Sequence, residues 1–142
     1  MKKNGSKVLV ELQAAGALKA VLQQVSGVRL REIKLEPFRP GHQREIVASI
    51  DVFGRQRTLT CAVASDATEP QISKALLDLR RNATPGPGGT TFVLIAPQMP
   101  SASAIYDANK VGFVDFQGNA HLNLGEAFIW KHTVPFQDVH PS

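Results

Sequence analysis

The sequence of 142 residues has little cysteine: Cys61 stands alone, which excludes a disulfide within the chain and fits a reducing compartment. A single cysteine in an apolar, alternating segment acts as a small hydrophobic residue, and nothing around it marks it as a nucleophile. Long apolar runs are missing as well, because Glu11, Gln13 and Lys19 interrupt the segment that would serve as a signal peptide. We therefore expect a cytoplasmic protein without a membrane partner.

Internal repeats, blocks of like charge and clustered metal ligands are also lacking. The four histidines show no close spacing with one another, so a zinc site has little support. The glycine- and proline-rich stretch 84–91 does not end in the Gly-Lys-Ser/Thr of a phosphate-binding loop, and it precedes a strand where that motif needs a helix. We interpret this stretch as a plain linker.

Positive charge is present in moderate excess. Lys and Arg number 16 against 12 Asp and Glu, which gives a net charge of +4 and an isoelectric point near 9.5. This excess favours contact with a polyanion such as nucleic acid. The length and the hydrophobic content of 43% suffice for one core. We expect a single domain over residues 1–132, followed by a flexible C-terminal tail at 133–142.

The first third of the chain carries two clear patterns. Helical spacing of apolar residues predicts a helix over 6–25 that ends at Gly27, and its apolar face comprises Val8, Leu12, Ala15, Leu18, Leu22 and Val25. Residues 28–36 alternate in polarity, but the parity changes near Arg31 and Glu32. This change predicts a strand with a bulge, followed by a loop over 37–43.

The segment 45–63 is typical of a hairpin. Two alternating apolar sets predict the core-facing residues, namely Ile46, Ala48, Ile50 and Val52 on the first strand and Leu59, Cys61 and Val63 on the second. Gly54 and Arg55 suit a two-residue turn in which glycine comes first, so that Phe53 faces Gln56. Counted outward from this turn, the pairs on the face away from the core are Asp51 with Thr58, Val47 with Ala62 and Glu45 with Ala64.

The second half alternates helices and strands. Thr68 and Gln71 resemble a capping box, and a helix follows whose apolar stripe comprises Ile72, Ala75, Leu76 and Leu79. The apolar run 90–97 predicts a buried central strand. A short helix over 102–109 and two or three short strands within 112–130 complete the order, with turns at 117–119 and at Gly125.

Four short segments carry a resemblance when they are read together with the order helix, three-stranded meander, helix and further strand. They are AVA at 62–64, LDLRR at 77–81, IAP at 95–97 and GFVDFQGNAHL at 112–122. In this combination the chain resembles the PD-(D/E)xK nuclease superfamily, and in particular small bacterial nuclease-like modules and abortive-infection antitoxin-like proteins. The resemblance implies an α/β domain of restriction-endonuclease-like fold, with a mixed central sheet flanked by helices.

In this superfamily an acidic residue on the second strand and an acid-x-lysine motif on the third hold Mg²⁺ and activate water for phosphodiester hydrolysis. Ala62 and Ala64 stand at the acid and lysine positions, and Val63, the core residue between them, is intact. The resemblance therefore implies a Mg²⁺-dependent DNA endonuclease as the parent and a chain that is inactive as written, with no tight Mg²⁺ binding. Natural loss and deliberate substitution both remain open explanations of the two alanines.

The first acid of such a site is best assigned to Glu45, because the counted register puts it beside both alanines. A solvated charge at a strand end is the alternative for Glu45. Asp51 is a weaker metal candidate, since it lies several residues along the hairpin. Gln71, at the start of the second helix, is a candidate for a polar group facing the scissile phosphate, and helix capping is its alternative role.

A set of basic residues is expected to contact DNA phosphates, although charge scattered for solubility is the alternative. The set comprises Arg44, Arg55, Arg57, Lys74 and Arg81. The leading hypothesis is thus a DNA-binding domain of endonuclease type without catalysis. The alternative is a non-catalytic antitoxin-like or phage-defence regulatory module that pairs with a protein partner or forms a homodimer.

Overall fold

The computed structural model describes residues 2–37, 44–66, 68–82, 86, 88–98, 111–125 and 128–131. This part of the chain forms two helices and seven strands. Their order is α1 (Lys2–Gln23), β1 (Val28–Pro37), β2 (Arg44–Val52), β3 (Arg55–Val63), α2 (Glu69–Asn82), β4 (Thr90–Ala96), β5 (Gly112–Asp115), β6 (Ala120–Asn123) and β7 (Phe128–Lys131). The loop was predicted over 37–43, but Pro37 belongs to β1. The rest of that loop, the predicted short helix at 102–109 and the predicted tail at 133–142 lie outside the described residues.

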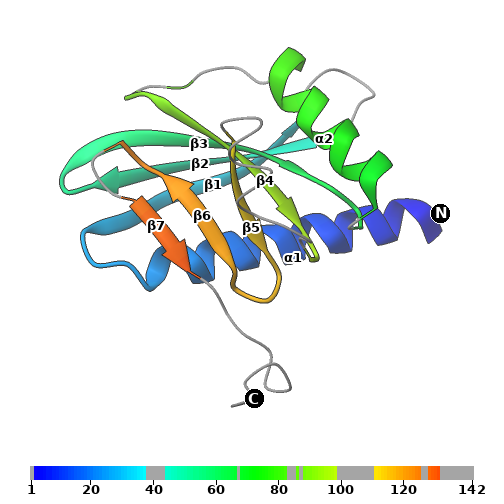
Figure 1. The fold of residues 1–142 in the computed structure, drawn as a ribbon, viewed down its shortest axis with the longest axis horizontal. Coiled ribbons are helices and arrows are strands. Elements are labelled where there is room, and N and C mark those ends of the chain that lie inside the picture. Colours follow the sequence, from blue (N-terminus) through cyan, green and yellow to red (C-terminus); the bar gives the residue numbers. More distant parts are fainter. Residues whose placement is uncertain are drawn as a thin grey trace, which may run out of the picture.

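The seven strands form one sheet in which each strand pairs with its sequence neighbours, from β1 at one edge to β7 at the other (Figure 1). The pairs β3–β4 and β4–β5 are parallel, and the other four are antiparallel. A parallel pair needs a crossover, and α2 supplies the one between β3 and β4. The predicted α/β class with a mixed sheet and a buried central strand at β4 is therefore confirmed.

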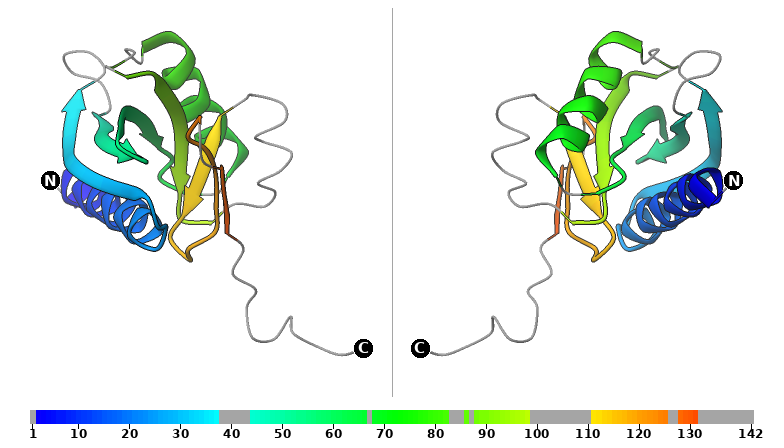
Figure 2. Two further views of the ribbon diagram at one scale, coloured as in Figure 1. Left: turned by 90° about the vertical axis from the view of Figure 1, so that its left-hand side faces the viewer. Right: turned by 90° about the vertical axis from the view of Figure 1, so that its right-hand side faces the viewer.

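The two helices lie on opposite faces of the sheet (Figure 2). Under α1, the main core joins Leu18 and Leu22 of the helix to the predicted inward residues of β2 and β3, such as Ile46 and Leu59. Under α2, a second core contains Ile72 and Leu79 of the helix together with side chains of β3, β4 and β5. No helix in the described ranges is both long and apolar enough to cross a membrane.

The first helix is present as predicted, but its buried face is rotated from the predicted one. The buried residues are Ala14, Leu18, Val21 and Leu22. Leu12, which was predicted to face the core, is 57% exposed. Leu12 lies two residues before the buried Ala14, and residues two apart in a helix point in nearly opposite directions. Leu12 therefore faces away from the core.

The predicted bulge in β1 is confirmed. The pairing of β1 with β2 shifts by one residue between Leu30 and Glu32. The shift allows Leu30 and Ile33 to pack against the same core although they are three residues apart.

The hairpin between β2 and β3 turns one residue earlier than predicted. Val52 pairs with Arg55, so the turn residues are Phe53 and Gly54, with φ angles of 50° and 85°. The Phe53 N–H donates to the carbonyl oxygen of Gly27 at 2.7 Å, which holds this non-glycine residue in the left-handed region.

The earlier turn changes every predicted partner across the hairpin. Phe53 does not face Gln56; instead Gln56 pairs with Asp51, and Thr60 pairs with Val47. The predicted pairs of Val47 with Ala62 and of Asp51 with Thr58 are therefore wrong. One step beyond the Ile46–Cys61 pair, the register brings Glu45 opposite Ala62 and not opposite Ala64.

Candidate functional site

The three residues on which the resemblance depends meet at one end of the sheet. Glu45 is the second residue of β2, Ala62 is the penultimate residue of β3, and Ala64 follows that strand directly. Because side chains alternate along a strand and Glu45 is in register with Ala62, all three belong to the same face of the sheet. The predicted convergence on one face is present, although the register differs by two residues.

This face was predicted to lie away from the core, and that prediction is wrong at the alanines. Ala62 and Ala64 are each 1% exposed. They pack in the second core with residues of α2 and β4, which are Ile72, Ala75, Leu79, Leu94 and Ala96. The cause is the crossover helix: α2 lies over β3 and β4, so the hairpin face becomes an interior where the helix covers it (Figure 1).

The environment of Glu45 is also an interior one. Its side chain is only 6% exposed. On the opposite face of the hairpin, burial raises the pKa of the Cys61 thiol far above its usual range, and the negative charge of Glu45 raises it further. Cys61 is therefore a protonated core residue, as its sequence context predicted.

A buried hydroxyl lies on the same face of β3 as Ala62. Thr60, two residues before Ala62, is 1% exposed, and its hydroxyl has no hydrogen-bond partner among the described residues. Within the same ranges, no three His, Cys, Asp or Glu side chains are grouped as metal ligands. Alanine side chains offer neither ligand atoms nor a charge at positions 62 and 64.

The start of α2 lies directly beyond the alanines. The Thr68 carbonyl accepts the first helical hydrogen bond from the Ile72 N–H at 3.0 Å, which confirms Thr68 as the N-terminal cap. The Thr68 hydroxyl donates to the Asp66 carboxylate, which also accepts the Thr68 N–H at 2.9 Å. These two hydrogen bonds lower the pKa of Asp66. The capping box between Thr68 and Gln71 stays a prediction.

Two candidate residues stand on the first turns of α2. Gln71 is half-buried, and Lys74 is exposed. Both follow the end of β3 after a short connection, so α2 begins at the alanine end of the sheet.

Asp51, the weaker metal candidate, lies elsewhere. Its Oδ2 accepts a hydrogen bond from the Nε of Arg31 at 2.6 Å, which makes an ion pair across β1 and β2. Six residues of extended strand separate Asp51 from Glu45, or about 20 Å. Asp51 therefore belongs to the tip of the hairpin and not to the alanine end.

The predicted basic set is divided between several places. Arg44 begins β2 beside Glu45, and Arg81 is exposed in the last turn of α2. Arg55 and Arg57 lie at the start of β3, so that about 17 Å of strand separates Arg57 from Ala62.

The glycine-rich stretch is more than the linker that the sequence indicated. The Gly89 carbonyl accepts the Thr58 N–H at 2.9 Å, and a Cβ placed on Gly88 would lie 2.1 Å from the Gln56 carbonyl oxygen. Gly88 and Gly89 therefore pack directly on β3, which requires that these two residues have no side chain. Two consecutive glycines just before a buried strand were the signal available in the sequence.

The GFVDFQGN segment at 112–119 contains a turn that Asp115 stabilises. Asp115 Oδ1 accepts the backbone N–H groups of Gln117 and Asn119, each at 2.9 Å, and Oδ2 accepts the Asn119 side-chain amide at 2.7 Å. Gly118 has a φ of 95°. The predicted turn at 117–119 is confirmed, and Asp115 holds it from a position that is 1% exposed.

Comparison of the chain with family models, with curated proteins and with solved structures gave no match. The chemistry of the alanine end must therefore be inferred from the residues and geometry of this chain.

Proposed function

We propose that the chain has the restriction-endonuclease-like fold and that it binds DNA without cleaving it. The order of elements supports the fold, because α1, the meander β1–β2–β3, α2 and β4 follow one another and β3 is parallel to β4. This is the arrangement that brings an acidic residue of the second strand and two positions of the third strand to the same end of a sheet.

The observation that carries the proposal is the shared face of Glu45, Ala62 and Ala64 at that end. In the parental reaction, Glu45 and an acid at position 62 would hold Mg²⁺, and a lysine at position 64 would steady the attacking water. With alanine at both positions, the chain would lack one ligand for the Mg²⁺ ion and the positive charge that would stabilise the attacking water. The fold is retained, and the hydrolytic step is lost.

The DNA contacts are assigned to basic side chains near this end and along α2. Arg44 adjoins Glu45, while Lys74 and Arg81 are exposed on the helix that follows the alanines. Phosphate contacts of this kind are independent of base sequence, and they weaken at higher salt because cations compete for the phosphates. The net charge of +4 acts in the same direction.

The test is the salt dependence of binding to a short DNA duplex, measured by fluorescence anisotropy between about 50 and 200 mM salt. We expect affinity to fall steeply with salt. The exchanges Lys74→Gln and Arg81→Gln should each weaken binding to duplexes of any sequence. Each should also reduce the slope of log affinity against log salt concentration by about 0.9. Lys19→Gln is the matched control, because Lys19 is exposed on α1, on the other face of the sheet.

Absence of duplex binding at the lowest salt would overturn the DNA proposal and favour the alternative, a protein-interaction or regulatory module. One observation favours that alternative. The alanine positions are closely packed against Leu94 and α2, as expected of a fold maintained as a scaffold.

A further inference from the structure

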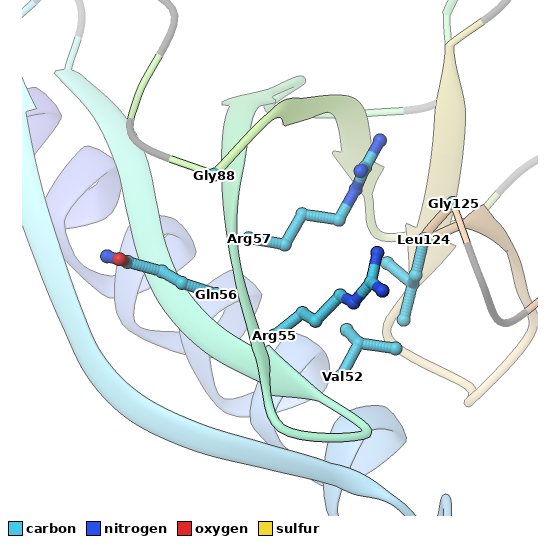
Figure 3. Close-up of a pocket in the computed structure, with 7 residues that line it drawn as sticks. All are labelled: Val52, Arg55, Gln56, Arg57, Gly88, Leu124 and Gly125. Carbon is cyan, nitrogen blue, oxygen red and sulfur yellow. The ribbon is translucent and has the colours of Figure 1, made fainter.

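A hollow of about 480 Å³ lies at the other end of β3 from the alanines (Figure 3). It opens between the start of β3, the glycine-rich segment before β4 and the residues that follow β6. The lining residues are Val52, Arg55, Gln56, Arg57, Gly88, Leu124 and Gly125. Both charged residues among them are arginines, and these described lining residues include no carboxylate.

Arg57 is held in a fixed orientation at the back of this hollow. Its Nε–H donates to the Thr91 hydroxyl at 2.7 Å, and that hydroxyl donates to the Asn123 carbonyl oxygen at 2.7 Å. The chain of bonds joins β3, β4 and β6. Among the described residues the Nε–H alone of this side chain has a hydrogen-bond partner, so the four N–H groups on the two Nη atoms remain to bind a ligand. No ion pair of the described residues involves Arg57.

Two glycines make room for the guanidinium. A Cβ on Gly125 would lie 2.9 Å from Arg57 Nη1, and a Cβ on Gly89 would lie 3.2 Å from the same atom. Both residues have positive φ angles, 83° and 92°, which a residue with a side chain adopts only with strain. The guanidinium therefore lies against bare backbone on two sides, where a side chain would otherwise fill the hollow.

Arg55 supplies a second guanidinium. Figure 3 shows the side chains of Arg55 and Arg57 extending in the same direction, toward Leu124 and Gly125, while Gln56 points the other way. This is the alternation of β3, which puts residues 55 and 57 on one face. Val52 and Leu124 form an apolar part of the wall.

We propose that this hollow is a binding site for a phosphate monoester group. Guanidinium groups present paired N–H donors that match phosphate oxygens, and the Nη groups of Arg57 supply such donors in this hollow. The volume is in the range of small-molecule sites and exceeds that of a bare phosphate. The phosphate therefore belongs either to a small phosphorylated molecule or to the 5′ end of a nucleic acid strand. The site is independent of the proposed duplex binding at the alanine end.

The first experiment is a titration of the ¹⁵N-labelled chain with inorganic phosphate, followed by NMR at constant ionic strength set with sodium chloride. We expect saturable shifts of the Gly88, Gly89 and Gly125 amides. Arg57→Gln should weaken phosphate binding about tenfold, the loss expected for one charge-assisted pair, and unchanged amide signals elsewhere in the spectrum show that the variant is folded. Arg29→Gln removes the same charge from an exposed position of β1 and should leave the phosphate affinity unchanged.

Two further titrations distinguish the sources of the phosphate. Adenosine 5′-monophosphate is compared with adenosine, and a 5′-phosphorylated single strand is compared with the same strand carrying a 5′-hydroxyl. Tighter binding of the mononucleotide identifies a small molecule, and tighter binding of the phosphorylated strand identifies a nucleic acid end. Shifts that do not saturate, or an equal loss of affinity in Arg29→Gln, would overturn the site. The inorganic phosphate titration tests only the hollow and uses no DNA. Its failure is therefore distinguishable from a failure of the duplex-binding experiment that tests the proposed function.

Discussion

Ala62 of β3 lies opposite Leu94 of β4 in parallel register, and both side chains are almost completely buried beneath α2. The position assigned to a metal-binding acid by the proposed nuclease descent is thus part of an apolar layer. Under that proposal, an acid and a lysine introduced at positions 62 and 64 should change both the stability of the domain and its response to metal.

The double exchange Ala62→Glu, Ala64→Lys should lower the free energy of unfolding in EDTA by several kcal/mol, because it buries a carboxylate and an ammonium. If the new carboxylate shares a cation with Glu45, Mg²⁺ should recover part of the loss by binding only the folded state. Urea unfolding with EDTA and with Mg²⁺ measures both effects. Nicking of supercoiled DNA in Mg²⁺ reports whether catalysis returns.

The matched control is Ala62→Gln, Ala64→Met, which has similar bulk without the charges. It should be destabilised without any response to Mg²⁺. A folded Glu/Lys variant that neither cuts DNA nor gains stability from Mg²⁺ would contradict descent from a metal-dependent nuclease.

Cys61 should make stability fall at alkaline pH. Burial, and next the negative charge of Glu45, raise the pKa of this thiol in the folded state. In the unfolded chain the thiol ionises at about pH 8.5. Above that pH the unfolded chain loses a proton that the folded chain keeps, so the free energy of unfolding falls by about 1.4 kcal/mol per pH unit. Below it, this contribution is fully present.

The comparison that isolates the Cys61 effect is chemical denaturation of the wild type and Cys61→Ala from pH 7 to 10. The alanine variant should be less stable at pH 7 because it leaves a small cavity, but its stability should decline less with pH. Parallel curves for the two proteins would show that the thiol is not buried as described.

Two glycine-to-alanine exchanges should have opposite effects. Gly16→Ala lies in the interior of α1, where a Cβ meets nothing within 4 Å, and should stabilise the domain by about 0.5–1 kcal/mol. Gly88→Ala would put its Cβ 2.1 Å from the Gln56 carbonyl oxygen at a φ of 80°, and should destabilise it by more than that. Thermal unfolding of the two variants provides the measurement. Equal stability of Gly88→Ala and wild type would refute close packing of the glycine-rich segment on β3.

Asp115→Ala should destabilise the domain by about 1–3 kcal/mol, because it removes a buried carboxylate that accepts three hydrogen bonds from Gln117 and Asn119. The next turn along the chain offers a comparison, since Asn123 Oδ1 accepts the Gly125 N–H there from an exposed position. Asn123→Ala is therefore the mild control, and urea unfolding compares the two. Similar losses in both variants would argue against a buried role for Asp115.

Local sequence patterns were sufficient for most elements of the described fold. The alternation through Ile46, Ala48 and Ile50 predicted the buried side of β2, and the change of parity at Arg31 predicted the bulge. These features depend on neighbouring residues alone, because the side-chain period of a strand is two and an inserted residue reverses it.

Such local patterns do not determine the register of the hairpin between β2 and β3. A glycine at position 54 suits a turn that begins either at Phe53 or at Gly54. The choice depends on the Gly27 carbonyl, which accepts the Phe53 N–H and lies in the connection between α1 and β1. A contact between residues so distant in the sequence leaves no local signal.

The sequence by itself determined that Glu45, Ala62 and Ala64 share a face, since their parity within two paired strands requires it. Only the tertiary structure decided that this face is interior, because the crossover α2 lies across β3 and β4. The same holds for the arginine hollow, where Arg57 donates to Thr91 and Thr91 donates to Asn123, contacts that form only when β3, β4 and β6 assemble. Periodicity constrains the direction of a side chain, whereas its surroundings depend on elements that fold back from elsewhere in the chain.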